Sequence, residues 1–241
     1  MTRRATITRM SYRRFLPAWF RAWLRDLIRP YEPDVCEALG RHVRRGMVVA
    51  DVGANRGYFS LRLAQLVGRR GHVIVVEALP TNAALIRRRA RRRLRGSRVE
   101  VIHAAATDAN GQIDLYPGRE LNPGQWNPGE WTLDQAFGAR TDTKPMDRRP
   151  ISVPGRRLDE LLAGRNVEVI KLDVEGAEEH VVRGMSRLLQ SDQPVVVLER
   201  HGEPGTRAIA ALVEAGYQIE STSGQPLGAD TTEHHVVARR H

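Results

Sequence analysis

The sequence predicts a single α/β domain whose sheet is mostly parallel. Short runs of apolar and β-branched residues alternate with amphipathic stretches of helical period, which is the pattern of strands buried between layers of helices. The last two runs, at residues 217–221 and 234–238, have no helical stretch between them, so we expect an antiparallel pair at one edge of the sheet. With 241 residues, the chain is long enough for one domain with a well-buried core and an extension, and too short for two domains that each have a large core.

The composition bounds the class of protein. The net charge is +10, and nearly all of the positive charge comes from arginine, because Lys144 and Lys171 are the only lysines. This balance indicates an acidic partner only weakly. The single cysteine, Cys36, excludes an internal disulfide. No run approaches the ~20 apolar residues that span a bilayer, and the N-terminus lacks the apolar core and cleavage site of a signal peptide, so we expect a cytoplasmic protein.

Residues 1–30 are expected to form an extension to a domain at residues 31–241. Aromatic residues and leucines recur near every fourth position over residues 12–28, with arginines between them, and Pro30 closes the pattern. This indicates a basic amphipathic helix, which in most proteins packs on the edge of the domain. A peripheral contact with an anionic membrane, a lid over the site and a contact in a homo-oligomer stay open.

Residues 47–60 are the stretch around which the domain is organised. An apolar strand stops at Asp51, and Gly53 and Gly57 bracket a turn into an amphipathic helix. A junction of this kind presents unpaired N–H groups and lets a ligand approach the main chain closely. A dinucleotide fingerprint would need three glycines, so the pattern favours a different nucleotide-like cofactor.

The ends of three successive strands point to an adenosine cofactor. Asp51 would repel a pyrophosphate but can hold an ammonium group, directly or through water. The strand at residues 73–76 ends at Glu77, whose carboxylate can accept hydrogen bonds from both hydroxyls of a ribose. The strand at residues 99–102 leads into small side chains at residues 104–106, which leave room for an adenine ring.

The middle of the chain is less regular. An arginine-rich helix is expected over residues 80–94. Its arginines usually indicate a helix face exposed to solvent, and the alternative is that they bind phosphate groups. Residues 112–116 are expected to return as an antiparallel strand after a turn. Residues 117–150 have prolines, glycines and two tryptophans with little periodicity, so we predict a loop insertion that covers the substrate.

Charged side chains follow two further strands. In the strand at residues 167–172, Lys171, Asp173 and Glu175 alternate with apolar residues, so period-two geometry is expected to place them on one side at its carboxyl end. The strand at residues 194–198 delivers Glu199 and His201 to the same edge of the sheet, where open parallel sheets bind ligands. A structural ion-pair network would explain these charges, but the cofactor loop at the same edge favours a role in binding or catalysis.

Four motifs, in this order, resemble the FkbM family of S-adenosylmethionine-dependent methyltransferases. They are Asp51-Val52-Gly53-Ala54-Asn55-Arg56-Gly57 with Tyr58-Phe59-Ser60, Val76-Glu77-Ala78-Leu79-Pro80 with Asn82, Arg157-Leu158-Asp159-Glu160-Leu161, and Ile170-Lys171-Leu172-Asp173-Val174-Glu175-Gly176-Ala177-Glu178. The resemblance covers roughly residues 47–200. It implies a Rossmann-like, mostly parallel sheet of seven strands with an antiparallel C-terminal strand, the class I methyltransferase fold.

The resemblance also implies a cofactor and a reaction. The cofactor would be S-adenosyl-L-methionine, the product S-adenosyl-L-homocysteine, and the acceptor a hydroxyl of a small molecule, sugar, glycolipid or secondary metabolite. The residues expected to bind the cofactor are Asp51, Gly53, Ala54, Asn55, Gly57, Tyr58, Phe59, Glu77, Ala78 and Ala105.

Methyl transfer requires an acceptor oxygen that is aligned opposite the sulfonium and stripped of its proton. We predict that Asp173 positions or deprotonates the acceptor and that Lys171 stabilises the developing alkoxide, with Glu175, Glu199 and His201 as supporting or alternative bases. Asp173, Glu175 and Glu199 could also offer oxygen ligands to Mg²⁺ or Ca²⁺, but without a dense aspartate cluster we expect no metal.

Other functions stay open at this point. A ribose hydroxyl of RNA is an alternative acceptor that suits the positive charge, and a non-catalytic module that binds membrane or nucleic acid is an alternative of another class. A nicotinamide dehydrogenase is least favoured, because the middle glycine is missing and the sheet ends in an antiparallel pair.

Overall fold

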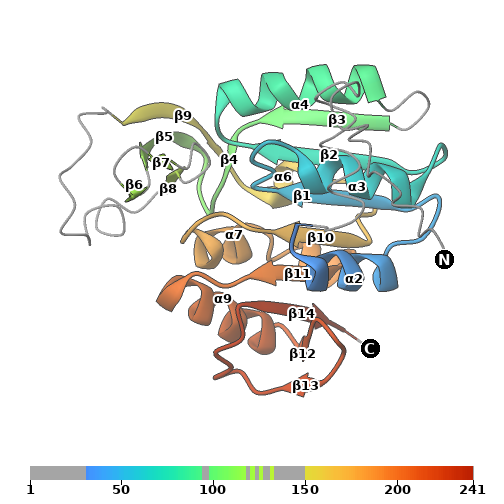
Figure 1. Cartoon of the computed structure of the whole chain (residues 1–241). Helices are drawn as coiled ribbons and strands as arrows, with labels where there is room; N and C mark the ends of the chain where they lie inside the picture. The colour runs from blue at the N-terminus through green and yellow to red at the C-terminus, as the bar shows by residue number, and fades with distance from the viewer. Residues whose placement is uncertain are drawn as a thin grey trace, which may run out of the picture.

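The computed structural model describes residues 31–93, 98–117, 120–122, 125–126, 131–132 and 150–240. Its centre is an eight-stranded sheet with the order β13-β12-β14-β11-β10-β1-β2-β3 (Figure 1). The five strands from β3 to β11 are parallel, whereas β14, β12 and β13 are joined to them and to one another by antiparallel pairing. The expected α/β fold with a mostly parallel sheet is confirmed.

Apart from β13, each strand of the main sheet coincides with an apolar run that the sequence predicted to be a strand. The strands of this sheet are β1 (Val48–Val52), β2 (His72–Glu77), β3 (Arg98–His103), β10 (Val169–Leu172), β11 (Val195–Glu199), β12 (Gln218–Ser221), β13 (Pro226–Leu227) and β14 (His235–Arg239). The helices are α2 (Pro33–His42), α3 (Tyr58–Val67), α4 (Pro80–Arg93), α6 (Leu158–Leu161), α7 (Glu178–Gly184), α8 (Leu188–Ser191) and α9 (Gly202–Glu214).

Two hydrophobic clusters, one on each face of the sheet, hold the layers together. Because successive strand residues point to opposite faces, Val49 and Val73 pack with α2, α3 and α4, whereas Ala50 and Ile74 pack with α6, α7, α8 and α9. Apolar residues on both faces of β1, β2, β10 and β11 explain why these strands appear in the sequence as continuous apolar runs.

The antiparallel tail contains one more strand than the resemblance implied. β14 inserts between β11 and β12, as expected for two closing strands without a helix between them. The two residues of β13 then pair with the outer side of β12, so the sheet has eight strands in place of seven. The addition is short, and it lies at the edge farthest from β3.

A second, smaller sheet lies beyond the carboxyl ends of the parallel strands (Figure 1). Its order is β4-β9-β5-β8, formed by Ala105–Ala106, Ile151–Arg156, Gly111–Pro117 and Trp131–Thr132. β5 is antiparallel as expected, but its partners are β9 and β8, which places it outside the main sheet. The predicted loop at 117–150 is therefore not wholly irregular, because it contains β8 and the pair β6 (Glu120–Asn122) and β7 (Gln125–Trp126).

The predicted amphipathic helix at residues 12–28 lies outside the described residues. Among the helices that are described, none has both the length and the hydropathy needed to cross a membrane.

Candidate active site

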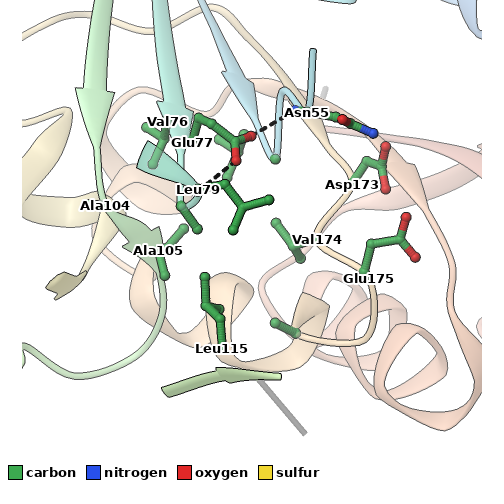
Figure 2. A pocket seen from close by; sticks show the side chains of 15 residues that line it. Asn55, Val76, Glu77, Leu79, Ala104, Ala105, Leu115, Asp173, Val174 and Glu175 are labelled. Carbon is green, nitrogen blue, oxygen red and sulfur yellow. Dashed lines mark hydrogen bonds between the residues drawn. The ribbon is translucent and has the colours of Figure 1, made fainter. Parts of the chain in front are cut away.

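A pocket opens at the carboxyl ends of β1, β2 and β10, where the sheet order reverses (Figure 2). The chain leaves β1 toward β2 on one side, and β10 flanks β1 on the other, so this is the crevice in which open α/β sheets bind ligands. The lining comes from five segments: Val52, Gly53 and Asn55; Val76, Glu77, Ala78 and Leu79; Ala104, Ala105 and Ala106; Leu115; and Asp173, Val174, Glu175 and Ala177.

Glu77 is held at the end of β2 by two backbone amides. The amide of Asn55 donates to Oε2 over 2.7 Å, and the amide of Leu79 donates to Oε1 over 2.8 Å (Figure 2). Burial raises the pKa of Glu77 to about 7, against the lowering effect of these amide hydrogen bonds. Each carboxylate oxygen has two lone pairs, so Glu77 retains capacity to accept a hydrogen bond from a ligand in the pocket.

The part of the pocket lining across from Asp173 and Glu175 is apolar (Figure 2). Ala105 and Leu115 are buried and pack with Leu79 in a separate small hydrophobic cluster. This wall exists because the chain continues from β3 into β4, and the small sheet brings β5 against it. A flat heterocycle would be desolvated between these side chains, as the small residues at 104–106 led us to expect.

The two glycines of the β1 loop are required by packing within the protein. Gly53 has φ +77°, and a Cβ there would overlap the carbonyl oxygen of Asp173. Gly57 has φ +79°, and a Cβ there would stand 2.8 Å from Cγ1 of Ile86 on α4. The need for glycine at these two positions therefore does not depend on a ligand that approaches the main chain, because the loop must also fit between β10 and α4.

Asp51 lies beneath the pocket and does not line it. Its side chain is fully buried, and Oδ2 accepts a hydrogen bond from the Ser60 hydroxyl over 2.5 Å. Burial raises the pKa of Asp51 although the nearby Lys171 opposes the shift. Asp51 is paired with Lys171 across β1 and β10, and its contact with the ammonium group of a cofactor stays a prediction.

Lys171 stands between two carboxylates on the same face of the sheet. It pairs in register with Asp51 across β1 and β10, and its Nζ lies 2.7 Å from Oδ2 of Asp173 and 4.8 Å from the ring centroid of Phe59. Burial by itself would lower the pKa of Lys171, but Asp173 and Asp51 raise it to about 12. The amine is therefore a fixed positive charge, which suits electrostatic stabilisation and excludes action as a base.

Asp173 lines the pocket and has one buried oxygen that the described residues leave unsatisfied. Oδ2 is paired with Lys171, whereas Oδ1 is buried and finds no hydrogen-bond partner within the described residues. Oδ1 of Asp51 and Oε2 of Glu178 are also buried without a partner among these residues, but Asp51 and Glu178 do not line the pocket. A buried acceptor without a partner costs free energy, and such a group in a folded protein calls for an explanation, such as a catalytic role or a bound molecule that completes its hydrogen bonds. Because Asp173 lines the pocket, a donor hydroxyl of a bound molecule would supply the missing partner.

The alternation expected for Lys171, Asp173 and Glu175 ends sooner than predicted. β10 stops at Leu172, and Glu175 has φ +51°, so a tight turn and not strand geometry positions its side chain. Glu175 still reaches the same region, because its Oε2 lies 3.4 Å from Nε2 of His201, which follows β11.

His201 is surrounded by carboxylates. Its Nδ1 lies 2.8 Å from Glu178, and its Nε2 lies 3.3 Å from Glu199 and 3.4 Å from Glu175. Burial favours the neutral ring, but the hydrogen bonds to Glu178 and Glu199 raise the pKa of His201 to about 11. A protonated imidazole cannot accept the proton of a substrate, which favours a positioning role for His201 over the predicted role as an alternative base.

Half of the residues predicted to bind the cofactor line the pocket. Those are Gly53, Asn55, Glu77, Ala78 and Ala105, whereas Asp51, Ala54, Gly57, Tyr58 and Phe59 lie outside the lining. Of the residues predicted for catalysis, Asp173 and Glu175 line it, and the more deeply placed Lys171, Glu199 and His201 do not.

Sequence reasoning assigned no role to Glu178, although it lies in a quoted motif. Glu178 is fully buried, and its Oε1 accepts hydrogen bonds from the amide of Gly176 and from His201. A carboxylate at the start of a helix, directly after a glycine turn, was the available signal. Leu115 was also missed, because only the small sheet brings it to the pocket.

Comparison with known proteins gives the family. A model of the methyltransferase FkbM domain matches residues 51–219, which is more than half of the chain. No curated protein sequence matches the chain.

Three solved structures share the fold. A methyltransferase FkbM from Methylobacillus flagellatus KT has a TM-score of 0.53 and 15% identity, over 81% of this chain and 43% of that one. Precorrin-6y C5,15-methyltransferase from Geobacter metallireducens GS-15 has a TM-score of 0.50 and 17% identity, over 90% and 92% of the two chains. A SAM-dependent O-methyltransferase from Thermotoga maritima has a TM-score of 0.50 and 14% identity, over 90% and 70%.

The chain thus spans less than half of the Methylobacillus protein, and at these identities the solved structures establish the fold alone. The family model goes further, because it covers the β1 loop, the residues that line the pocket, β10, β11 and the start of β12. The chain belongs to the FkbM family of S-adenosylmethionine-dependent methyltransferases.

Proposed function

We propose that this enzyme is an O-methyltransferase that transfers the methyl group of S-adenosylmethionine to a hydroxyl of a small molecule, a sugar, a glycolipid or another secondary metabolite. The observation that carries the proposal is Asp173, which lines the pocket with a buried, unsatisfied Oδ1 while Lys171 holds its Oδ2. A hydroxyl is both the hydrogen-bond donor that Oδ1 lacks and the nucleophile of an O-methylation.

Glu77 supports the orientation of the cofactor in this proposal. The ribose hydroxyls would donate to its two oxygens, and the adenine would lie between Ala105 and Leu115. The sulfonium end then extends toward Asp173 and Glu175, across the pocket from Glu77 (Figure 2).

The proposed reaction is an in-line displacement. The acceptor oxygen forms a bond to the methyl carbon as the bond from that carbon to sulfur breaks, which releases S-adenosylhomocysteine. The hydroxyl proton passes to Oδ1 of Asp173, and the Lys171 ammonium, 2.7 Å from Oδ2, stabilises the negative charge that develops on the acceptor oxygen.

The test is methyl transfer from S-adenosylmethionine labelled in its methyl group. The purified protein is incubated with separate panels of glycosides, lipids, phenols and RNA, and the product linkage is identified by mass spectrometry. Label in an ether bond of a sugar or small molecule supports the proposal. Label on nitrogen or carbon, or on a ribose hydroxyl of RNA with an affinity that falls steeply with salt, would overturn it in favour of another acceptor class.

A cytoplasmic location and a homo-oligomer stay predictions. A peripheral membrane contact of residues 12–28 is also a prediction, which a lipid acceptor in the panel would favour.

A further inference from the structure

Three histidines direct the same ring nitrogen toward one carboxylate outside the pocket lining. Nε2 of His234 lies 3.1 Å from Oε1 of Glu199, and Nε2 of His201 lies 3.3 Å from the same oxygen. Nε2 of His235 lies 3.7 Å from Oε2 of Glu199. Glu199 and His235 are paired across β11 and β14, so the sheet itself sets part of this arrangement.

The other ring nitrogen of each histidine is already bound. Nδ1 of His235 lies 2.7 Å from Oδ2 of Asp34, and Nδ1 of His234 lies 3.2 Å from the carbonyl oxygen of Arg200. Histidines that ligate a metal almost always donate their second N–H to a carboxylate or a backbone carbonyl, which fixes the tautomer and aims the free nitrogen at the ion. Both His234 and His235 have this anchoring.

The separations among the donor atoms suit a single ion. One ligand atom each from Glu199, His234 and His235 lies within 4.8 Å of the others. Ligands at about 2.0–2.1 Å from a tetrahedral ion would be roughly 3.3 Å apart. Nε2 of His234 lies 3.1 Å from Oε1 of Glu199, and Nε2 of His235 lies 3.7 Å from Oε2, so each ring nitrogen is close to this separation from one of the two carboxylate oxygens.

Unsatisfied polar atoms provide an independent observation. Nε2 of His235 is buried and has no hydrogen-bond partner within the part of the chain that the structure describes. The same holds for Oε2 of Glu32, which lies 3.8 Å from that nitrogen. Carboxylates of Glu32, Asp34 and Glu199 surround His235, so an added cation would be attracted and not repelled.

We propose that Glu199, His234 and His235 bind a divalent first-row transition metal of the class that prefers imidazole nitrogen, such as Zn²⁺. Two imidazoles and one carboxylate are typical ligands for Zn²⁺ or Fe²⁺ and are a poor set for Mg²⁺ or Ca²⁺. The site goes beyond methyl transfer and does not depend on it. Because a Glu199 oxygen also lies within 4.8 Å of donor atoms of Asp173 and His201, the metal would be one side chain away from the acceptor end of the pocket.

The test is calorimetric titration of Zn²⁺ into tag-free, chelator-treated protein, with Co²⁺ absorption as a second readout of coordination by nitrogen. The variants are His234→Gln and His235→Gln. His234 is more than half exposed, so its replacement is expected to leave the fold intact, as checked by circular dichroism. The matched control is His72→Gln, because His72 begins β2, at the opposite end of the strand from Glu77.

The expected result is one Zn²⁺ per chain with a dissociation constant of micromolar or lower. Each ligand variant should weaken binding by at least about tenfold, because one of three protein ligands is lost, while His72→Gln leaves it unchanged. Absence of saturable uptake would overturn the proposal and leave an ion-pair network of imidazolium and carboxylate groups. Uptake that survives both ligand variants but is lost in His201→Gln would also overturn it, since the ion would then lie on Asp173 and His201.

Discussion

Gly53 and Asp173 meet backbone to backbone at the carboxyl edge of the sheet. A Cβ at Gly53 would overlap the carbonyl oxygen of Asp173 and stand 3.1 Å from Cγ1 of Val174, and the amide of Asp173 donates to the carbonyl of Val52 over 3.1 Å. The loop expected to carry the cofactor and the loop that carries Asp173 therefore share one rim of the pocket. In the proposed reaction, this contact would bring the sulfonium of the cofactor close to the hydroxyl of the acceptor.

Gly53→Ala should destabilise the protein by about 3 kcal/mol. The new methyl group has no space beside Asp173, which costs ~1–3 kcal/mol by overpacking, and φ of +77° adds about 1–2 kcal/mol for a residue with a Cβ. The measurement is the free energy of unfolding in urea.

Gly46→Ala is the matched control for this substitution. Gly46 has φ +93° but nothing within 4 Å of an added Cβ, so only the backbone strain of about 1–2 kcal/mol should appear. Equal losses for the two variants would contradict the close contact between Gly53 and Asp173.

Glu77→Gln should weaken the binding of S-adenosylmethionine by roughly tenfold to a hundredfold. Hydrogen bonds to a charged acceptor contribute about 1.5–3 kcal/mol, and the amide has one acceptor oxygen where the carboxylate has two. The measurement is calorimetric titration of the cofactor, with the exposed Glu214→Gln on α9 as the control. An unchanged affinity in a folded Glu77→Gln protein would remove Glu77 from the cofactor site.

The affinity for S-adenosylmethionine should fall as the pH decreases through about 7. Burial raises the pKa of Glu77 to about 7, so the carboxylate is ionised above this pH and protonated below it. Ribose hydroxyls favour the ionised acceptor, and the affinity should therefore approach a tenfold loss per pH unit at pH well below 7 and a plateau above it. The check is titration of the cofactor at a series of pH values, and a flat profile in the wild type would contradict the assignment. The Glu77→Gln protein should lack this dependence.

Lys171→Met should destabilise the fold by about 3–5 kcal/mol despite the apolar replacement. Lys171 is 3% exposed, and its removal leaves the buried charge of Asp51 and the partly buried charge of Asp173 without their shared cation. Thermal and urea unfolding measure the loss. The double variant with Asp173→Asn should recover part of it, because fewer unpaired charges remain, and the absence of any recovery would argue against the coupling of the two side chains.

Asp173→Asn should lower the rate of methyl transfer by about 10²–10⁴-fold while the affinity for S-adenosylmethionine changes little. The amide keeps the shape of the side chain but cannot take the proton of an acceptor hydroxyl, and general base catalysis contributes a factor of this size. Single-turnover rates with labelled cofactor and an accepted substrate measure the effect, and Asp230→Asn, at an exposed loop position, is the control. Full activity in a folded Asp173→Asn protein would remove the base from the mechanism.

The sequence predicted the positions of the parallel strands along the chain and the edge of the sheet at which Gly53, Glu77 and Asp173 meet, because the carboxyl ends of parallel strands share one edge. It did not predict that Asp51 lies beneath the pocket. The depth of a side chain at a strand end depends on the helices that cover that face, and period alone does not give it.

The sequence also did not predict contacts between segments that lie far apart along the chain. His235 meets Glu199 only because β14 returns antiparallel beside β11, and Asp34 meets His235 from α2 at the other end of the chain. β5 pairs with β9, and the long insertion separates these two strands in the sequence. The local pattern of apolar and polar residues does not specify which residues of such distant strands pair with each other.

A crystal structure of the protein with S-adenosylhomocysteine is the most direct test of the central claim. We predict that the ribose hydroxyls lie within hydrogen-bond distance of the Glu77 carboxylate, that the adenine lies against Ala105 and Leu115, and that the sulfur points toward Asp173. A product molecule bound elsewhere, or bound with its sulfur away from Asp173 and its ribose out of reach of Glu77, would contradict the account.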